Sequence, residues 1–331
     1  MPAFTFRPAA MTDLEPVMAM IHASEQVDEG YVRNPIEAEK ASWELSTFSL
    51  ATDSLSAWDD AGRCLGIAEV YDLRPEHVFA NCYLNVDPEF RETAIPATLV
   101  AFVAERLERM AQEANPGLRV AGFTVGQREG WPLFRHYAAR GWRVARHSWA
   151  MGRELSGVLP EPVWPNGITV RAAEESDSRA VHALDQEAFA DHFNFNPMPF
   201  EDWRQMADAY ASTPDFWLLA FDDADLVGIS LNAPAMPEDP EQGYIGELGV
   251  RRDHRGQGLG LALLRASFRQ LAEAGAKRVK LDVDSENLTG ATRLYERAGM
   301  HVLEKRTTYS KDLRSGKTLW TTSLDGSYTA R

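Results

Sequence analysis

The sequence predicts an α+β protein made of two tandem domains, each a mixed, antiparallel-rich sheet flanked by helices. Its 331 residues are too many for one typical core and suit two domains. The second half repeats the opening pattern of the first. In the second half, strand patterns at 216–221, 226–231, 244–250 and 278–283 are separated by a turn, a loop and an apolar-striped helix at 261–271.

Composition excludes several classes of function. The net charge of −15 disfavours non-specific binding to nucleic acid. No apolar run approaches the roughly 20 residues of a membrane span, and the N-terminus lacks a signal-peptide layout. We therefore expect a cytoplasmic protein with no membrane partner. Cys64 and Cys82 alone form neither a disulfide framework nor a metal-ligand cluster, so we expect no metal.

The repeat is visible at the start of each half. Segments 4–17 and 168–181 share an Arg, an Asp and a Val at one offset, and each reads as a short strand followed by a helix. Asp13 and Asp177 stand where a helix N-cap is expected. Because the period is domain-sized, we interpret the repeat as a duplication.

The ends of the two halves also match, since 131–142 corresponds to 291–300. The stretch that joins the halves is rich in Pro and Gly, as linkers are. The predicted domains are residues 1–155 and 168–331, with a linker at 156–167. A last pair of strands is expected over about 302–313.

The segment from Glu247 to Gly260 predicts a strand, a glycine-rich turn and the start of a helix. The turn places an arginine, Arg255, before Gly256, Gly258 and Gly260. Such a turn directs several backbone N–H groups into one concavity, which suits a pyrophosphate. A Cβ there would block the phosphate or forbid a positive φ.

A dinucleotide site is the alternative for this turn. That fingerprint opens the first βα unit of a domain and is followed about 20 residues later by an acidic residue on the ribose. Here the turn lies deep in the chain. Asp282 and Asp284 alternate along a predicted strand, where they either line a cleft or face water, and His254 is expected to be exposed.

The turn resembles motif A of the GNAT family of N-acetyltransferases: Arg or Gln, any two residues, Gly, any residue, then Gly or Ala. The run from Asn287 to Met300 resembles the family's closing motif, with Met in place of its Phe. The likeness is strongest over 247–299. The tandem arrangement is similar to two-domain members of the mycothiol synthase type.

The resemblance implies that acetyl-CoA binds to the second half and that no metal is needed. In the family, the strand before the turn splays from its neighbour, and its N–H groups face the acetyl group. Val250 would then help to polarise the carbonyl. The implied cofactor-binding residues are Leu248, Gly249, Val250, Arg255, Gly256, Gln257, Gly258, Leu259, Gly260 and Asn287.

Tyr295 and Glu247 are the candidate catalytic residues. Tyr295 matches the family's general acid, and its alternative is an aromatic side chain that packs on a helix. Glu247 is the candidate base, and its alternative is a surface glutamate, because side chains alternate faces along a strand. Asp191 and His192 are a second group for the acceptor pocket, although a solvated loop histidine fits equally.

The first half has lost the glycine turn. Glu92, Ala94 and Pro96 stand at the three glycine positions. A carboxylate there repels phosphate, and Pro96 removes an N–H donor. We therefore expect a degenerate copy, with Tyr137, the counterpart of Tyr295, in a packing role.

Together these features predict an N-acetyltransferase that moves the acetyl group of acetyl-CoA to a primary amine by direct attack in a ternary complex. A small-molecule acceptor is expected, without its identity. One alternative is a non-catalytic acyl-CoA-binding or regulatory protein, and another is transfer of a longer acyl chain. The oligomeric state is left open.

Overall fold

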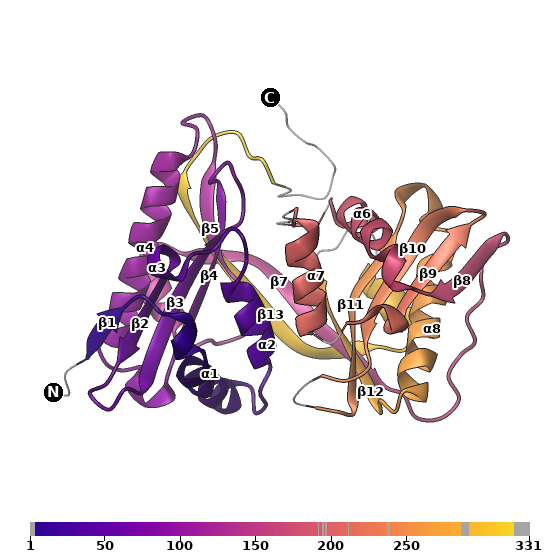
Figure 1. Cartoon of the computed structure of the whole chain (residues 1–331), viewed down its shortest axis with the longest axis horizontal. Coiled ribbons are helices and arrows are strands. Elements are labelled where there is room, and N and C mark those ends of the chain that lie inside the picture. Colours follow the sequence, from indigo (N-terminus) through magenta and orange to yellow (C-terminus); the bar gives the residue numbers. More distant parts are fainter. Residues whose placement is uncertain are drawn as a thin grey trace. The chain divides into compact units, whose positions relative to one another are not determined.

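The computed structural model describes residues 4–190, 192–193, 195, 197–210, 212–236, 239–285 and 291–320. The described chain forms two compact units (Figure 1). Unit 1 holds residues 4–147 and 306–319, and unit 2 holds 148–305 and 320. No helix within these ranges is long and apolar enough to cross a membrane.

Unit 1 is a mixed sheet with helices packed on it, and its strand pairs are antiparallel except β4–β5. Helix α4 connects those two parallel strands. The strands are β1 (Thr5–Arg7), β2 (Ser54–Trp58), β3 (Cys64–Asp72), β4 (Phe79–Val86), β5 (Val120–Thr124), β6 (Gln127–Arg128), β7 (Arg143–Glu154) up to residue 147 and β13 (His301–Arg314) from residue 306 onward. The helices are α1 (Leu14–Asp28), α2 (Ile36–Trp43), α3 (Leu50–Asp53), α4 (Ile95–Glu113) and α5 (Phe134–Ala138), with short 3-10 turns η1 (Met11–Asp13) and η2 (Pro88–Phe90).

Unit 2 repeats this plan, and its only parallel pair among the described strands is β11–β12, connected by α8. Its strands are β8 (Ile168–Ala172), β9 (Trp217–Asp222), β10 (Asp225–Ala233), β11 (Gln242–Val250), β12 (Arg278–Asp284) and the second half of β7 (Arg143–Glu154). Its helices are α6 (Ser178–Phe189), α7 (Phe200–Ala209), α8 (Leu259–Glu273) and α9 (Ala291–Arg297), with 3-10 turns η3 (Glu175–Asp177), η4 (Pro214–Phe216) and η5 (Arg252–His254). The predicted α+β class is confirmed.

The two units take their last strands from each other's part of the chain. From Ser148 onward, β7 pairs with β12 of unit 2. From Arg306 onward, β13 belongs to unit 1 and pairs with β5. Residues 148–155, predicted to lie in the first domain, thus belong to unit 2, and residues 306–319, predicted to lie in the second domain, belong to unit 1.

The predicted strand pair at 302–313 was wrong, because this stretch is one strand of 14 residues. It contains neither Gly nor Pro, so no turn residue interrupts it.

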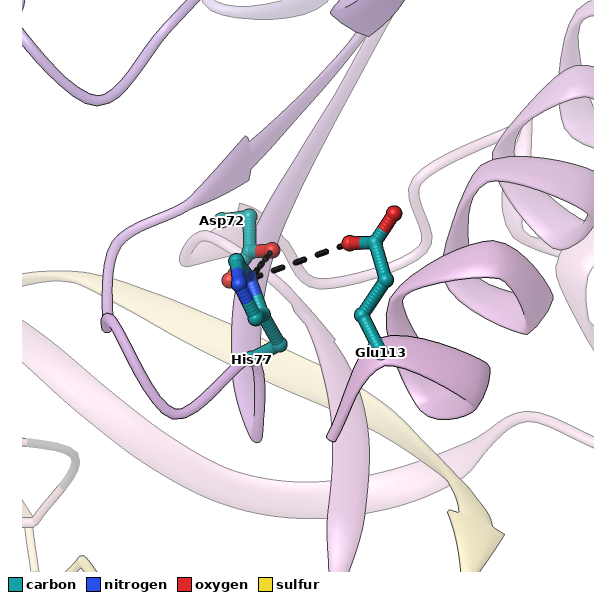
Figure 2. A group of neighbouring side chains, drawn as sticks. All are labelled: Asp72, His77 and Glu113. Carbon is teal, nitrogen blue, oxygen red and sulfur yellow. Dashed lines mark hydrogen bonds and ion pairs between the residues drawn. The ribbon is translucent and has the colours of Figure 1, made fainter. Parts of the chain in front are cut away.

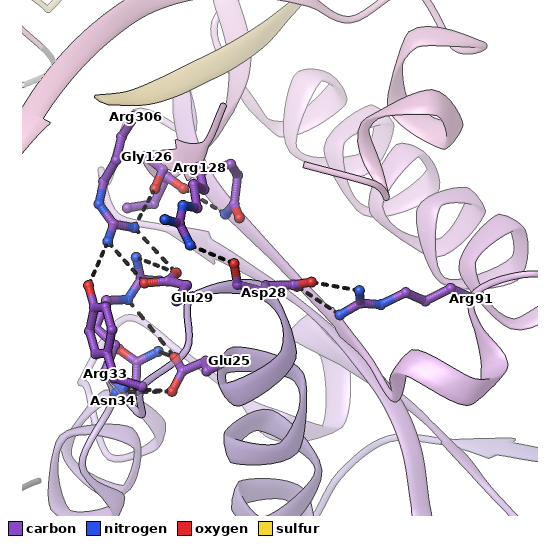
Figure 3. Close-up of polar contacts among 12 residues, drawn as sticks. Glu25, Asp28, Glu29, Arg33, Asn34, Arg91, Gly126, Arg128 and Arg306 are labelled. Atoms are coloured by element: carbon purple, nitrogen blue, oxygen red, sulfur yellow. Dashed lines mark hydrogen bonds and ion pairs between the residues drawn. The ribbon is translucent and has the colours of Figure 1, made fainter. Parts of the chain in front are cut away.

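Buried arginine–carboxylate bonds fix β13 in unit 1 (Figure 3). The carboxylate-rich end of α1 accepts bonds from arginines of separate segments. Arg306 of β13 donates to Glu29 Oε2 at 3.0 Å, and both side chains are at least nine-tenths buried. At the same end of α1, Arg91 donates to the Asp28 carboxylate and the Arg33 guanidinium lies 3.5 Å from Glu29. Arg128 donates to the backbone carbonyl of Asp28.

Asp13 and Asp177 stand at the N-cap positions of α1 and α6, but neither side chain caps its helix. Instead each carboxylate binds an arginine two-fold, Arg7 at 2.5 and 2.9 Å and Arg171 at 2.6 and 2.9 Å. Each also accepts the N–H of the residue three positions earlier at 2.8 Å. The expected side-chain caps are thus corrected, and the repeat extends to this contact.

Candidate active site

The glycine turn has the conformation that the sequence predicts. Gly256 has φ +78° and Gly258, the N-cap of α8, has φ +94°. This left-handed region suits glycine because a Cβ clashes there with the backbone. A Cβ on either residue would meet no atom within 4 Å, so backbone conformation, rather than crowding, requires glycine. At Gly260 an added Cβ would make only ordinary contacts, at 3.7 Å from Leu294.

The start of α8 offers hydrogen-bond donors beside this open surface. The first intrahelical bond runs from the N–H of Ala262 to the carbonyl of Gly258, at 3.1 Å. The N–H groups of Leu259, Gly260 and Leu261 therefore have no acceptor within the helix. Together with the positive end of the helix dipole, they form a site that fits a pyrophosphate.

Arg255 supports the turn with its side chain. Its guanidinium donates to the carbonyl of Val250 and to that of Ala188, both at 3.0 Å. The corresponding Arg91 in unit 1 donates in the same way to Val86, at 3.3 Å. The guanidinium thus joins the turn to the end of β11 and to α6. The Gln257 amide bonds the carbonyl of Asp253 at 3.3 Å.

Strands β11 and β12 part beside the turn. Their parallel pairing covers only Gln242 to Tyr244 on β11, although β11 continues to Val250. A bulge at Gly246, where the register with β10 shifts, precedes this stretch. Alternate residues from Leu248 to Val250 therefore present backbone groups to a side where β12 does not pair.

Glu247 lies half-buried on β11, where the charge of a second carboxyl, that of Asp185, acts on it. Burial raises the pKa of Glu247 well above its usual range, and the charge of Asp185 raises it further. Burial also raises the pKa of Asp185, to about 6. Asp185 is 5% exposed, and its Oδ1 is buried without a hydrogen-bond partner in the described chain. Burial and the Asp185 charge thus both favour the protonated form of Glu247.

Asp185 was not among the site residues predicted from the sequence, although a signal was present. The apolar stripe of α6 contains Val181, Leu184 and Ala188. Asp185 occupies the intervening stripe position, four residues after Val181, where a helix that packs on a sheet normally carries an apolar side chain. A carboxyl at a core position of an otherwise regular stripe indicates a functional residue.

Two tyrosines lie within electrostatic reach of Glu247. Burial, and then the Glu247 charge, raise the pKa of Tyr295 well above its usual range, so this phenol keeps its proton at neutral pH. Tyr295 is 8% exposed and packs in the core between α8 and β12. The Tyr244 hydroxyl donates to Asp282 Oδ2 at 3.0 Å, and burial raises its pKa most. Asp282 is thus hydrogen-bonded to Tyr244, which lies three positions before Glu247 on β11.

The structure describes some of the remaining candidate site residues and not others. The His192 ring packs edge-on against Phe189, with centroids 4.5 Å apart. Asp191 and Asn287 lie outside the described residues. His254, expected to be exposed, is half-buried, and hydrogen bonds to Asp253 at 2.7 Å and Asp222 at 3.1 Å raise its pKa.

The corresponding turn of unit 1 is built differently. No residue of 91–96 has a positive φ, and Pro96 stands in the first turn of α4. Glu92 is exposed and accepts a bond from Arg135 at 2.6 Å. Tyr137 is fully buried against Trp131 and Trp142, and its hydroxyl has no partner within the described ranges.

The comparisons with known proteins decide the family. The model of the Acetyltransferase (GNAT) family matches residues 179–300. A mycothiol acetyltransferase of Saccharopolyspora erythraea is 30% identical over 244 residues, which are 72% of this chain and 79% of that protein. The chain belongs to the GNAT family. The resemblance inferred from the glycine turn and the closing motif is thereby confirmed.

Solved GNAT structures extend the likeness to both units. A GCN5-related N-acetyltransferase from Sphaerobacter thermophilus has a TM-score of 0.74 at 31% identity, covering 96% of this chain and 98% of that one. A tandem GNAT protein from the clavulanic acid biosynthesis pathway shares the fold, with a TM-score of 0.68 at 15% identity over 95% and 100% of the two chains.

Some curated relatives match over a shorter stretch. The mycothiol acetyltransferase of Thermobispora bispora is 36% identical over 166 residues, which are 49% of this chain and 56% of that protein. The chain thus matches little more than half the length of that relative and of two from Salinispora species.

Proposed function

We propose that this GNAT protein transfers the acetyl group of acetyl-CoA to the primary amine of a small molecule within a ternary complex. One observation carries the proposal: within unit 2, the half-buried carboxyl of Glu247, the parted end of β11 and the left-handed glycine turn follow one another along 247–260.

Each element has a role in the proposed reaction. The N–H groups of the turn and of α8 hold the pyrophosphate, while β11 binds the pantetheine arm and polarises the thioester carbonyl. Glu247 accepts a proton as the amine nitrogen bonds to the carbonyl carbon. As the carbon–sulfur bond breaks, the Tyr295 hydroxyl donates its proton to the departing thiolate, and the proton held by Glu247 then returns to the Tyr295 oxygen, so both residues regain their starting forms.

The carboxyls of unit 2 support a cationic acceptor. Asp185, Glu247 and Asp282 lie on α6, β11 and β12 of unit 2, and a primary ammonium complements such acidic groups before it loses its first proton to solvent. The name of the curated relatives directs the acceptor search to amines of thiol-sugars of the mycothiol class.

Release of CoA thiol tests this function. Wild-type protein is incubated with acetyl-CoA and a panel of amines that includes amino sugars, polyamines and amino acids. We expect thiol release with at least one amine and a large loss of rate in Tyr295→Phe at unchanged acetyl-CoA affinity. Tight acetyl-CoA binding without turnover on any amine would favour the non-catalytic alternative.

A further inference from the structure

Three side chains from separate segments of unit 1 converge far along the chain from the glycine turn (Figure 2). Asp72 ends β3, His77 lies in the loop before β4, and Glu113 ends α4. His77 Nδ1 lies 2.7 Å from Asp72 Oδ2 and 3.9 Å from Glu113 Oε2. One ligand atom from each residue lies within 4.8 Å of the other two.

Asp72 is the buried member of this group. It is 7% exposed, and its second oxygen, Oδ1, is buried without a hydrogen-bond partner among the residues that the structure describes. A buried carboxylate oxygen normally has a partner, and a bound ion is one of the few explanations for an exception. Asp72 therefore has unused capacity to bind a ligand.

His77 completes a ligand set that suits a metal. Its backbone has φ +56°, an uncommon left-handed conformation for a residue other than glycine. Its imidazole faces both carboxylates and is 41% exposed, so an ion can reach it from solvent. One imidazole nitrogen and two carboxylates are typical of zinc and similar transition ions, whereas Mg²⁺ and Ca²⁺ prefer all-oxygen sites.

We propose that Asp72, His77 and Glu113 bind one divalent transition-metal ion of the zinc class, with a water in the fourth position. The ion would tie the end of β3, the following loop and the end of α4 together. Arg106 lies 3.6 Å from Asp72 Oδ2 and opposes the ion, but its nearer partner is Asp53, at 2.6 Å. The two ligand carboxylates outweigh this one partly neutralised charge.

The test uses the full chain without an affinity tag, stripped of metal by a chelator and titrated with ZnCl₂ by calorimetry. His77→Asn removes the imidazole, and Asn tolerates the left-handed backbone. Glu113→Gln removes the exposed carboxylate. Glu108→Gln, at an exposed position of the same helix, is the matched control with the same charge change.

We expect one zinc ion per chain and a higher melting temperature with zinc. The His77 and Glu113 variants should each lose about tenfold or more in affinity, while the Glu108 control keeps it. Absence of zinc binding in the wild type would overturn the site. So would an affinity that both ligand variants retain, or one that the control loses equally.

Discussion

Among single residues, Glu247 and Asp185 are central to the proposed proton transfer from the amine. Replacing Glu247 with Gln removes the proposed proton acceptor, while the amide still fills the half-buried position. We expect the turnover rate to fall about 10²–10⁴-fold, the usual contribution of a general base. Acetyl-CoA affinity, measured by calorimetry, should be unchanged. An unaltered turnover rate would assign the proton to another group.

Asp185 should tune the pH dependence of Glu247. The reaction needs the ionised base, so the rate should rise with pH through the raised pKa of Glu247. In Asp185→Asn the neighbouring negative charge is gone, so the pKa of Glu247 falls and the rising limb moves to lower pH. A rate profile that does not move in the variant would show that these carboxyls are not coupled.

Asp185 should also lower stability at neutral pH. Its folded pKa of about 6 lies above the ordinary value of 3.8, so the folded state holds the proton more tightly than the unfolded chain. Stability is therefore lost as pH rises from about 4 through 6. Asp185→Asn should raise the free energy of unfolding by about 1–3 kcal/mol at pH 7.5 and by little at pH 4. Denaturant unfolding at both pH values checks this, and an equal effect at both would contradict it.

At the scale of elements, the glycine turn makes a sharp prediction. Gly258→Glu places a carboxylate where the pyrophosphate is proposed to bind, so acetyl-CoA affinity should be lost. The strain of a left-handed side chain, about 1–2 kcal/mol, lowers stability as well. Gly275→Glu is the matched control, because Gly275 follows the other end of α8 with φ +105° and open space around it.

The two variants should lose similar stability in thermal unfolding, and only the Gly258 variant should lose acetyl-CoA. If both retained the cofactor, the turn would not be its binding site.

The turn was predictable because its information is local. The strand, the glycines and the following helix lie within 247–273, and each residue type has a direct conformational reason. The hydrogen bond from the Arg255 guanidinium to Ala188 was harder to predict, because Ala188 is 67 positions away in the chain. The effect of Asp185 on Glu247 also could not be predicted from the sequence, because the two carboxyls lie on different elements, α6 and β11.

For the molecule as a whole, the duplication was predicted from the sequence. That β13 joins the sheet of unit 1 and the end of β7 joins the sheet of unit 2 was not. No local feature of the sequence shows whether β13 pairs with a strand of the second half of the chain or with β5 of the first half. Either strand would offer the same backbone donors and acceptors. The buried pair of Arg306 and Glu29 adds a side-chain contact to the β5 ladder that holds β13 in unit 1.

Arg306→Met tests that tie. It removes one of the two cations beside the buried Glu29 carboxylate and leaves Arg33, at 3.5 Å, as the other, so unit 1 should lose about 1–3 kcal/mol of stability. Asp312→Asn is the control on the same strand, because the Asp312 side chain is 57% exposed and its pair with Arg119 contributes about 0–1 kcal/mol. Denaturant unfolding compares the two, and equal small losses would show that Arg306 does not anchor β13.

The number of acetyl-CoA molecules bound to each chain, counted by native mass spectrometry, tests the proposed cofactor site. We propose one loaded site, in unit 2, and a unit 1 whose turn has lost cofactor binding. The expected result is one acetyl-CoA per wild-type chain and none in Gly258→Glu. Two per chain would show that unit 1 still binds the cofactor, and none in the wild type would contradict the proposed function itself.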